Sequence, residues 1–116
     1  IKKLIKLNKI KNINFHYIKT DRIWLRDSGP IFITNKVEKK KVILNFGFNG
    51  WSKYKNYKND NKINNSISKI TNFKKIDPII KKKGRIRKII MEGGAFDVNG
   101  SGTILLTEEC LLSKIQ

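Results

Sequence analysis

The stretch TDRIWLRDSGP, residues 20–30, decides how the sequence on either side of it is interpreted. Its eleven residues hold two Asp, two Arg and a Trp, and they close on a Gly-Pro pair. Gly29-Pro30 ends any helix, and the apolar residues 31–33 resume a β-type pattern. The stretch is therefore predicted to be a loop between strands that carries chemically active side chains.

Local patterns predict the elements around this loop. Residues 1–12 place apolar and lysine residues at mixed helical spacing, which predicts a short amphipathic helix. Ile13, Phe15 and Tyr17 alternate as on a half-buried strand, and residues 42–48 alternate again before the Asn49-Gly50 turn. Apolar residues at intervals of three and four over residues 63–73 predict an amphipathic helix that ends by Asp77-Pro78.

The rest of the chain is predicted to be turns and strands. The expected segments are a charged turn at 36–41, a polar loop at 52–62, a basic turn at 81–84, a strand at 86–91, a hairpin with arms at 95–99 and 103–106, and a turn or helix cap at Thr107. Strands, one intervening helix and then more strands predict a mixed α/β arrangement. A length of 116 residues suits one domain, with no repeat or linker within it.

The charge of the chain is strongly positive, with 26 Lys and Arg against 9 Asp and Glu, a net +17. Of the basic residues 22 are Lys and 4 are Arg, and Lys, Ile and Asn together make up 55 of the 116 residues. All three have adenine- and thymine-rich codons, so the base composition of the gene explains the charge better than selection for binding to a polyanion. Nucleic acid is accordingly the less favoured partner, because Arg is the usual phosphate ligand and this chain has few Arg residues.

Composition also argues against a membrane-spanning or secreted protein. No apolar run approaches the roughly 18–20 residues that cross a bilayer, and residues 1–10 are too charged for a signal peptide. The single cysteine, Cys110, allows no internal disulfide and no thiolate metal cluster. A reducing, cytoplasmic location is expected.

Asp27 is the first candidate site residue. With Arg26 beside it and Trp24 three positions earlier, it could clamp a planar cation, because a carboxylate accepts two parallel N–H bonds while an indole face covers the plane. The alternative is a structural ion pair between Arg26 and Asp27, with Trp24 in the core.

Glu92 is the second candidate. It follows the apolar residues 89–91, where an acid at the end of a buried strand needs a partner, and Gly93-Gly94 allow close approach of a ligand or another strand. The alternative is a β-bulge that turns Glu92 to solvent.

Three other features are weaker candidates. Trp51, Tyr54 and Tyr57 alternate with lysines, either as a nucleic-acid platform or, more simply, as a surface loop. His16 has no acidic or Cys neighbour and is predicted to be a packed or surface histidine. Cys110 follows two glutamates, which make it a poor nucleophile candidate, and it is predicted to be a small core residue.

Three blocks, TDRIWLRDSGPIFI, FGFNGWSKY and MEGGAFDVNGSGTILLTEECLL, together resemble the agmatine deiminase family, which includes the Porphyromonas-type peptidylarginine deiminases. The resemblance implies part of a pentein fold, a five-part α/β propeller, with residues 1–116 as about a third of one catalytic domain. It implies hydrolysis of agmatine to N-carbamoylputrescine and ammonia in putrescine biosynthesis, through a cysteine thiouronium, with no metal or organic cofactor.

The same resemblance assigns roles to the candidates. Asp27 would hold guanidinium nitrogens and Trp24 would border the substrate. Glu92 would be a second acid that helps to bind and orient the cation. Cys110 matches a family segment that does not hold the nucleophile, and His16 matches no catalytic histidine, so the fragment is expected to be inactive alone. Peptidyl-arginine deimination and a basic nucleic-acid-binding module remain the alternatives, and the sequence does not set the oligomeric state.

Overall fold

The computed structural model describes residues 11–115, so the helix predicted over residues 1–12 lies almost wholly outside the described residues.

The strand predicted from Ile13 is wrong. Residues 13–20 form no regular element, none of the described strands pairs with them, and Tyr17 is 95% exposed. Alternation alone does not make a strand, because a strand needs a neighbour to receive its backbone hydrogen bonds.

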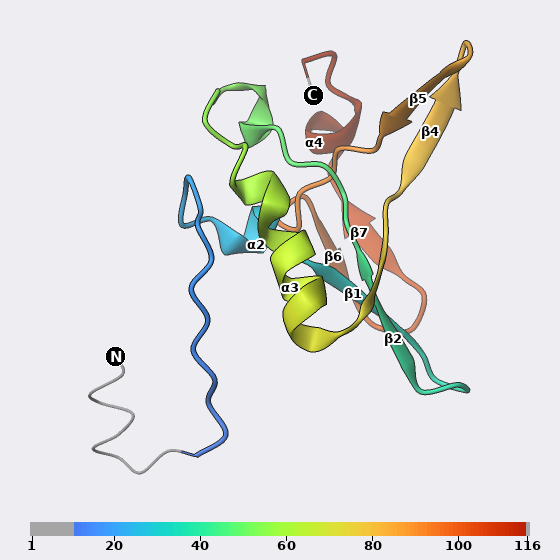
Figure 1. The fold of residues 1–116 in the computed structure, drawn as a ribbon. Coiled ribbons are helices and arrows are strands. Elements are labelled where there is room, and N and C mark those ends of the chain that lie inside the picture. The colour runs from blue at the N-terminus through green and yellow to red at the C-terminus, as the bar shows by residue number, and fades with distance from the viewer. Residues whose placement is uncertain (1–10, 116) are drawn as a thin grey trace.

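One three-stranded sheet and one helix form the centre of the fold (Figure 1). Strands β1 (Ile31–Asn35) and β2 (Lys40–Leu44) pair antiparallel, with Ile33 opposite Val42. Helix α3 (Ile63–Thr71) then leads into β3 (Lys74–Ile76), which lies parallel to β2. The predicted β–helix–β order is thus confirmed, although β2 ends at Leu44 and the turn before it is shorter than expected.

Helix α3 ends earlier than the sequence pattern indicates. Asn72 adopts the left-handed conformation, with φ of 57°, and ends the helix at Thr71 instead of at Asp77-Pro78. A left-handed residue after the last turn is a common way to stop a helix, and Asn tolerates it better than most residues. Phe73, predicted on the helix, lies beyond it.

Two further hairpins follow. Strands β4 (Ile79–Lys82) and β5 (Arg85–Lys88) pair through a two-residue turn in which Lys83 and Gly84 both have positive φ. The predicted basic turn at 81–84 is therefore half strand, because residues 81 and 82 belong to β4. Strands β6 (Phe96–Val98) and β7 (Ile104–Leu106) form the predicted hairpin, and α4 (Glu108–Leu112) begins after the N-cap Thr107, as expected.

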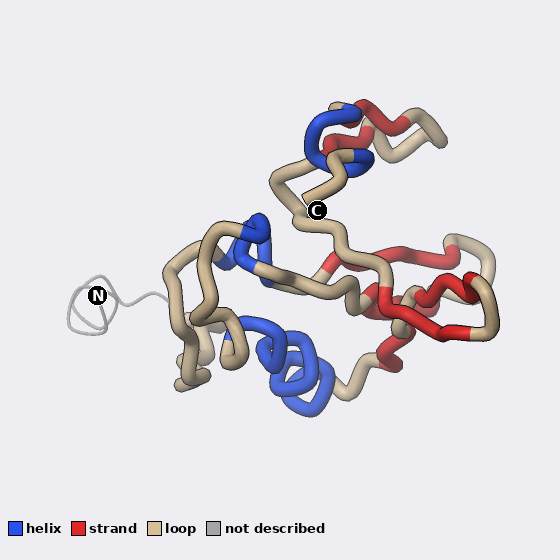
Figure 2. Tube along the Cα trace, turned by 90° about the horizontal axis from the view of Figure 1, so that it is seen from above, coloured by secondary structure: helices blue, strands red, loops and turns tan. Residues whose placement is uncertain are grey.

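The core is small. Ile43, Phe48, Ile63 and Ala95 are its buried apolar residues, while many large apolar side chains on the hairpins are exposed. Much of the trace is loop, and the strands lie in separate groups (Figure 2). No helix among the described residues is long and apolar enough to cross a membrane.

Short helical turns interrupt the loops near the site. Helix α2 (Leu25–Ser28) lies inside the stretch predicted as a loop, and two 3-10 turns, η1 (Gly50–Ser52) and η2 (Asp60–Lys62), bound the predicted polar loop. Gly47 forms an isolated parallel bridge with Ile90, which brings residues 89–92 beside the end of β2. These contacts bring distant segments together around one pocket.

Candidate functional site

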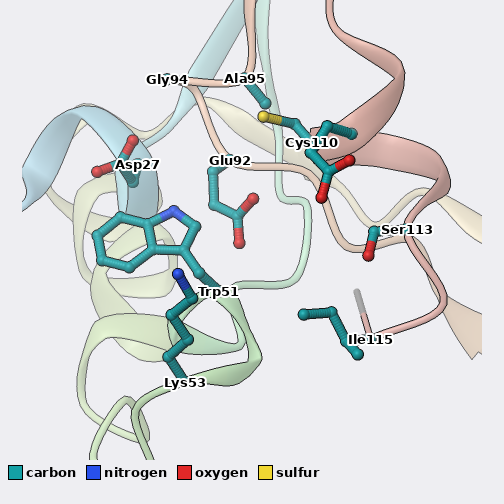
Figure 3. A pocket seen from close by; sticks show the side chains of 10 residues that line it. Asp27, Trp51, Lys53, Glu92, Gly94, Ala95, Cys110, Ser113 and Ile115 are labelled. Atoms are coloured by element: carbon teal, nitrogen blue, oxygen red, sulfur yellow. The ribbon is translucent and has the colours of Figure 1, made fainter.

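A pocket of about 310 Å³ lies where four segments meet. Asp27 comes from α2, Trp51 and Lys53 from η1 and the residue after it, and Glu92, Gly94 and Ala95 from the turn before β6. Helix α4 and the residues after it complete the lining with Glu109, Cys110, Ser113 and Ile115 (Figure 3). The volume falls at the small end of the usual range for small-molecule sites, about 300–1,000 Å³.

Helix α2 and the Gly93-Gly94 pair touch directly. The Gly93 N–H donates to the Asp27 carbonyl at 3.3 Å, and Arg26 Nε donates to the Gly93 carbonyl at 3.0 Å. A Cβ on Gly93 would lie 2.2 Å from the Arg26 carbonyl oxygen, and one on Gly94 would lie 2.3 Å from Asp27 Oδ1. The two motifs therefore fit together only because both residues are glycine.

Asp27 is a half-buried carboxyl group beside the pocket. Burial raises its pKa, while the Gly94 backbone N–H and the nearby Arg26 charge partly oppose that rise. Within residues 11–115 Arg26 makes no ion pair with Asp27, and its guanidinium donates to the Gly93 carbonyl instead. The ion-pair alternative is thus wrong, and Asp27 lines the pocket.

Glu92 is the most buried acid of the pocket, with 2% of its surface exposed. Its side chain points into the pocket, opposite the Trp51 ring (Figure 3). The alternative of a bulge that turns Glu92 to solvent is therefore wrong. Two acids 65 residues apart in sequence line one small cavity, and a buried acid is stable only when a cation or hydrogen-bond donors compensate it.

The aromatic wall of the pocket is Trp51, whose ring stands beside Asp27 and Glu92 (Figure 3). Trp24, which the family resemblance implied would border the substrate, is not among the lining residues. Its ring lies behind Trp51, with centroids 4.4 Å apart, and Phe48 packs edge-on against Trp51 at 5.7 Å. Trp24 therefore supports the wall rather than forming its surface.

Trp51 holds an unusual backbone conformation, with φ of 54° and ψ of 29°. The left-handed region is rare for a bulky residue and costs of order 1–3 kcal/mol, so the surrounding packing must enforce it. The Asn49 side chain accepts from the Ser52 N–H at 3.1 Å and closes the turn around Trp51. The Asn49-Gly50 turn was visible in the sequence, but the strained residue after it was not.

A cation and two acids fix the loops behind this wall. The Arg22 guanidinium lies over the rings of Tyr54, at 4.0 Å, and Trp24, at 4.7 Å. Asp60 Oδ1, in a residue only 1% exposed, accepts from the backbone N–H groups of Asp21 and Arg22 at 2.9 and 3.3 Å. In return Asp21 accepts from the Asn59 backbone and side chain, and the backbone bond lowers the pKa of Asp21.

The remaining sequence candidates fall in different places. Cys110 is exposed and lines the pocket, so its predicted core position is wrong; its sulfur points toward Ala95 (Figure 3). His16 is exposed and does not line the pocket. Tyr54 and Tyr57 pack with Trp51 and Phe48 respectively, at 6.0 and 6.4 Å. Among residues 11–115 no three His, Cys, Asp or Glu side chains are grouped to hold a metal.

Known proteins are similar to this chain in both sequence and fold. A family model for Porphyromonas-type peptidyl-arginine deiminases matches residues 1–116. The agmatine deiminase of Pseudomonas fluorescens Pf-5 is 30% identical over 106 residues, 90% of this chain and 27% of that protein. The one from P. fluorescens SBW25 is 31% identical over 110 residues, again 90% of this chain and 27% of the relative. The chain thus spans about 27% of the length of these curated relatives.

Solved structures of agmatine deiminases are also similar to this chain. A C. jejuni agmatine deiminase variant with substrate bound matches 99% of this chain and 32% of its own, with a TM-score of 0.71 and 30% identity. The agmatine deiminase of Enterococcus faecalis matches 84% of this chain and 26% of its own, with a TM-score of 0.68 and 28% identity. The expected fold class, a partial pentein fold of α/β type, is therefore confirmed.

Proposed function

Because this chain belongs to the Porphyromonas-type peptidyl-arginine deiminase family, we propose that it supplies the guanidinium-binding part of an agmatine deiminase. The observation that carries the proposal is the meeting of Asp27 and Glu92 in one pocket beside the Trp51 ring. A guanidinium group is planar, permanently charged near neutrality and rich in N–H donors. Two carboxylates and an aromatic face are the partners that such a group requires.

The two acids divide the binding in this proposal. Asp27, held by the Gly94 N–H, accepts guanidinium N–H groups at the open side of the pocket, while Glu92 compensates the charge at its buried side. The Trp51 ring covers the plane of the cation, with Trp24 behind it. Asp27 and Glu92 then act catalytically by holding the guanidinium carbon in the orientation that attack requires.

The reaction in this proposal is hydrolysis of agmatine. A cysteine thiolate attacks the guanidinium carbon, ammonia leaves with a proton from a histidine, and water then hydrolyses the thiouronium and releases N-carbamoylputrescine. Agmatine and one water thus give N-carbamoylputrescine and one ammonia, a step toward putrescine. Cys110 does not match the nucleophilic cysteine of the family, and His16 does not match its catalytic histidine. The described chain alone should therefore bind agmatine but not turn it over.

Calorimetric titration of agmatine into the chain tests the binding claim. Saturable binding should weaken at least about tenfold in Asp27→Asn and Glu92→Gln, because each removes a charge-assisted hydrogen bond. Asp97→Asn is the matched control, since Asp97 is an exposed acid on the same segment as Glu92. Equal affinity in all four proteins would reject the proposal, and free arginine and a peptidyl arginine as ligands report the substrate preference of the pocket.

A further inference from the structure

The hairpin of β4 and β5 carries a dense positive charge that the proposed site does not use. Six of the ten residues 79–88 are Lys or Arg and none is acidic. Two of the four arginines in the sequence, Arg85 and Arg87, lie here. The hairpin projects away from the rest of the fold (Figure 1). Lysines are spread throughout the chain, whereas half of its four arginines lie on this one projecting ribbon.

Strand register places the strongest charges on one face. Ile80 is opposite Arg87 and Lys82 is opposite Arg85, so these four side chains share a face of the ribbon. With Lys83 at the turn they line one groove. Within residues 11–115 the only hairpin residue in an ion pair is Lys88, bound to Asp77 at 3.2 Å, and it lies on the opposite face. The groove face therefore presents cations that no described acid compensates.

We propose that this face of the β4–β5 hairpin binds the phosphates of double-stranded DNA. Arg85 and Arg87 are two residues apart on one strand face, about 7 Å, and each guanidinium can hold a phosphate through two parallel hydrogen bonds. A two-stranded ribbon fits the major groove of B-form DNA, about 12 Å wide. The inference concerns a surface separate from the pocket and does not depend on the proposed agmatine binding.

Other polyanions suit the hairpin less well. Residues 79–88 contain no aromatic side chain, so they lack the stacking platform that single-stranded nucleic acids use. The tip, residues 82–85, is Lys-Lys-Gly-Arg, without the aromatic or large apolar residues that anchor a protein in a membrane surface. The deep and narrow major groove of A-form RNA does not admit side chains of a ribbon.

Fluorescence anisotropy of a labelled 20-base-pair DNA duplex tests the proposal with the whole chain. Four phosphate contacts, from Lys82, Lys83, Arg85 and Arg87, predict that affinity falls about 150-fold between 50 and 200 mM salt. The double variant Arg85→Glu/Arg87→Glu should bind more than about tenfold more weakly, with a salt slope shallower by about 2. The matched control Lys55→Glu/Lys58→Glu removes the same charge from an exposed loop and should change affinity less than about threefold.

Circular dichroism shows whether each variant folds, and Arg85→Gln/Arg87→Gln provides a milder second variant with the same expected direction. Equal losses in the hairpin and control variants would overturn the proposal, because binding would then follow net charge alone. Binding of single-stranded DNA, polyglutamate or anionic vesicles as tightly as the duplex would also overturn it. Preference for the duplex, lost only in the hairpin variants, is the result that the proposal requires.

Discussion

Gly94→Ala should displace Asp27 and so weaken both the fold and the site. A Cβ on Gly94 would lie 2.3 Å from Asp27 Oδ1, whereas real Cβ contacts stay above 3.0 Å, so the carboxyl group must move by at least 0.7 Å. Overpacking of this kind typically destabilises by about 1–3 kcal/mol. The backbone of Gly94 is not in the left-handed region, so the expected effect is steric. Loss of a well-placed carboxylate should also reduce agmatine affinity about tenfold.

Urea unfolding followed by tryptophan fluorescence measures the first effect, and calorimetry with agmatine measures the second. Gly100→Ala is the control: Gly100 has φ of 71° and nothing within 4 Å of its Cβ position, so that variant should lose stability without losing agmatine binding. In an Asp27→Ala background the clash disappears, so Gly94→Ala should cost at least about 1 kcal/mol less than in the original chain. Equal destabilisation in both backgrounds, with unchanged agmatine affinity, would refute the steric argument.

Three other predictions concern the acids and the aromatic wall. Because burial raises the pKa of Asp27, the stability contributed by its protonated form is lost as pH rises through that pKa, while agmatine affinity rises. Calorimetry from pH 3 to 7 should place the midpoint of the rise in affinity above the usual Asp pKa of about 3.9, and a midpoint below that value would contradict the burial argument. Trp51→Leu should weaken agmatine binding about 3- to 10-fold while Trp51→Phe retains most of it, and equal affinities would show that the ring does not contact the cation. Asp60→Ala should lower the free energy of unfolding by about 2–4 kcal/mol in urea titrations, since it removes a buried acceptor from two backbone N–H groups, and a loss as small as that of exposed Asp97→Ala would contradict this role.

Elements set by local patterns could be predicted from the sequence. The apolar intervals within residues 63–73 gave helix α3, and the Asn99-Gly100 turn between two apolar runs gave the β6–β7 hairpin. Thr107 was recognisable as a helix cap from its position before Glu108. These features depend on side-chain periodicity and turn preferences within about ten residues, which the sequence displays directly.

Elements that depend on a distant partner could not be predicted. Residues 13–17 alternate like a strand, but no described strand accepts their hydrogen bonds. Residues 81–82 look like a basic turn, yet pairing with Arg85 and Ile86 makes them part of β4. Helix α2 is only four residues long, too short for any periodicity to show.

The site was predictable in its acids and not in its aromatic wall. Asp27 and Glu92 stood out because each is an acid in an apolar or turn context, where it needs a partner, and the structure brings both to one pocket. Trp51 was expected only in a nucleic-acid platform or a surface loop, because its place in the wall depends on a left-handed backbone and on packing against Trp24. The exposed position of Cys110 at the pocket likewise follows from how α4 is placed, which local sequence does not specify.

The most direct test of guanidinium binding by Asp27, Glu92 and Trp51 is an NMR measurement of contacts between agmatine and the chain. Nuclear Overhauser effects should connect the guanidinium protons to the Trp51 ring and to the backbone amide of Gly94, because both residues line the pocket. These contacts should disappear in Asp27→Asn while the spectrum otherwise stays that of the folded chain. Contacts confined to residues outside the pocket, or contacts unaffected by Asp27→Asn, would contradict the assignment of the site.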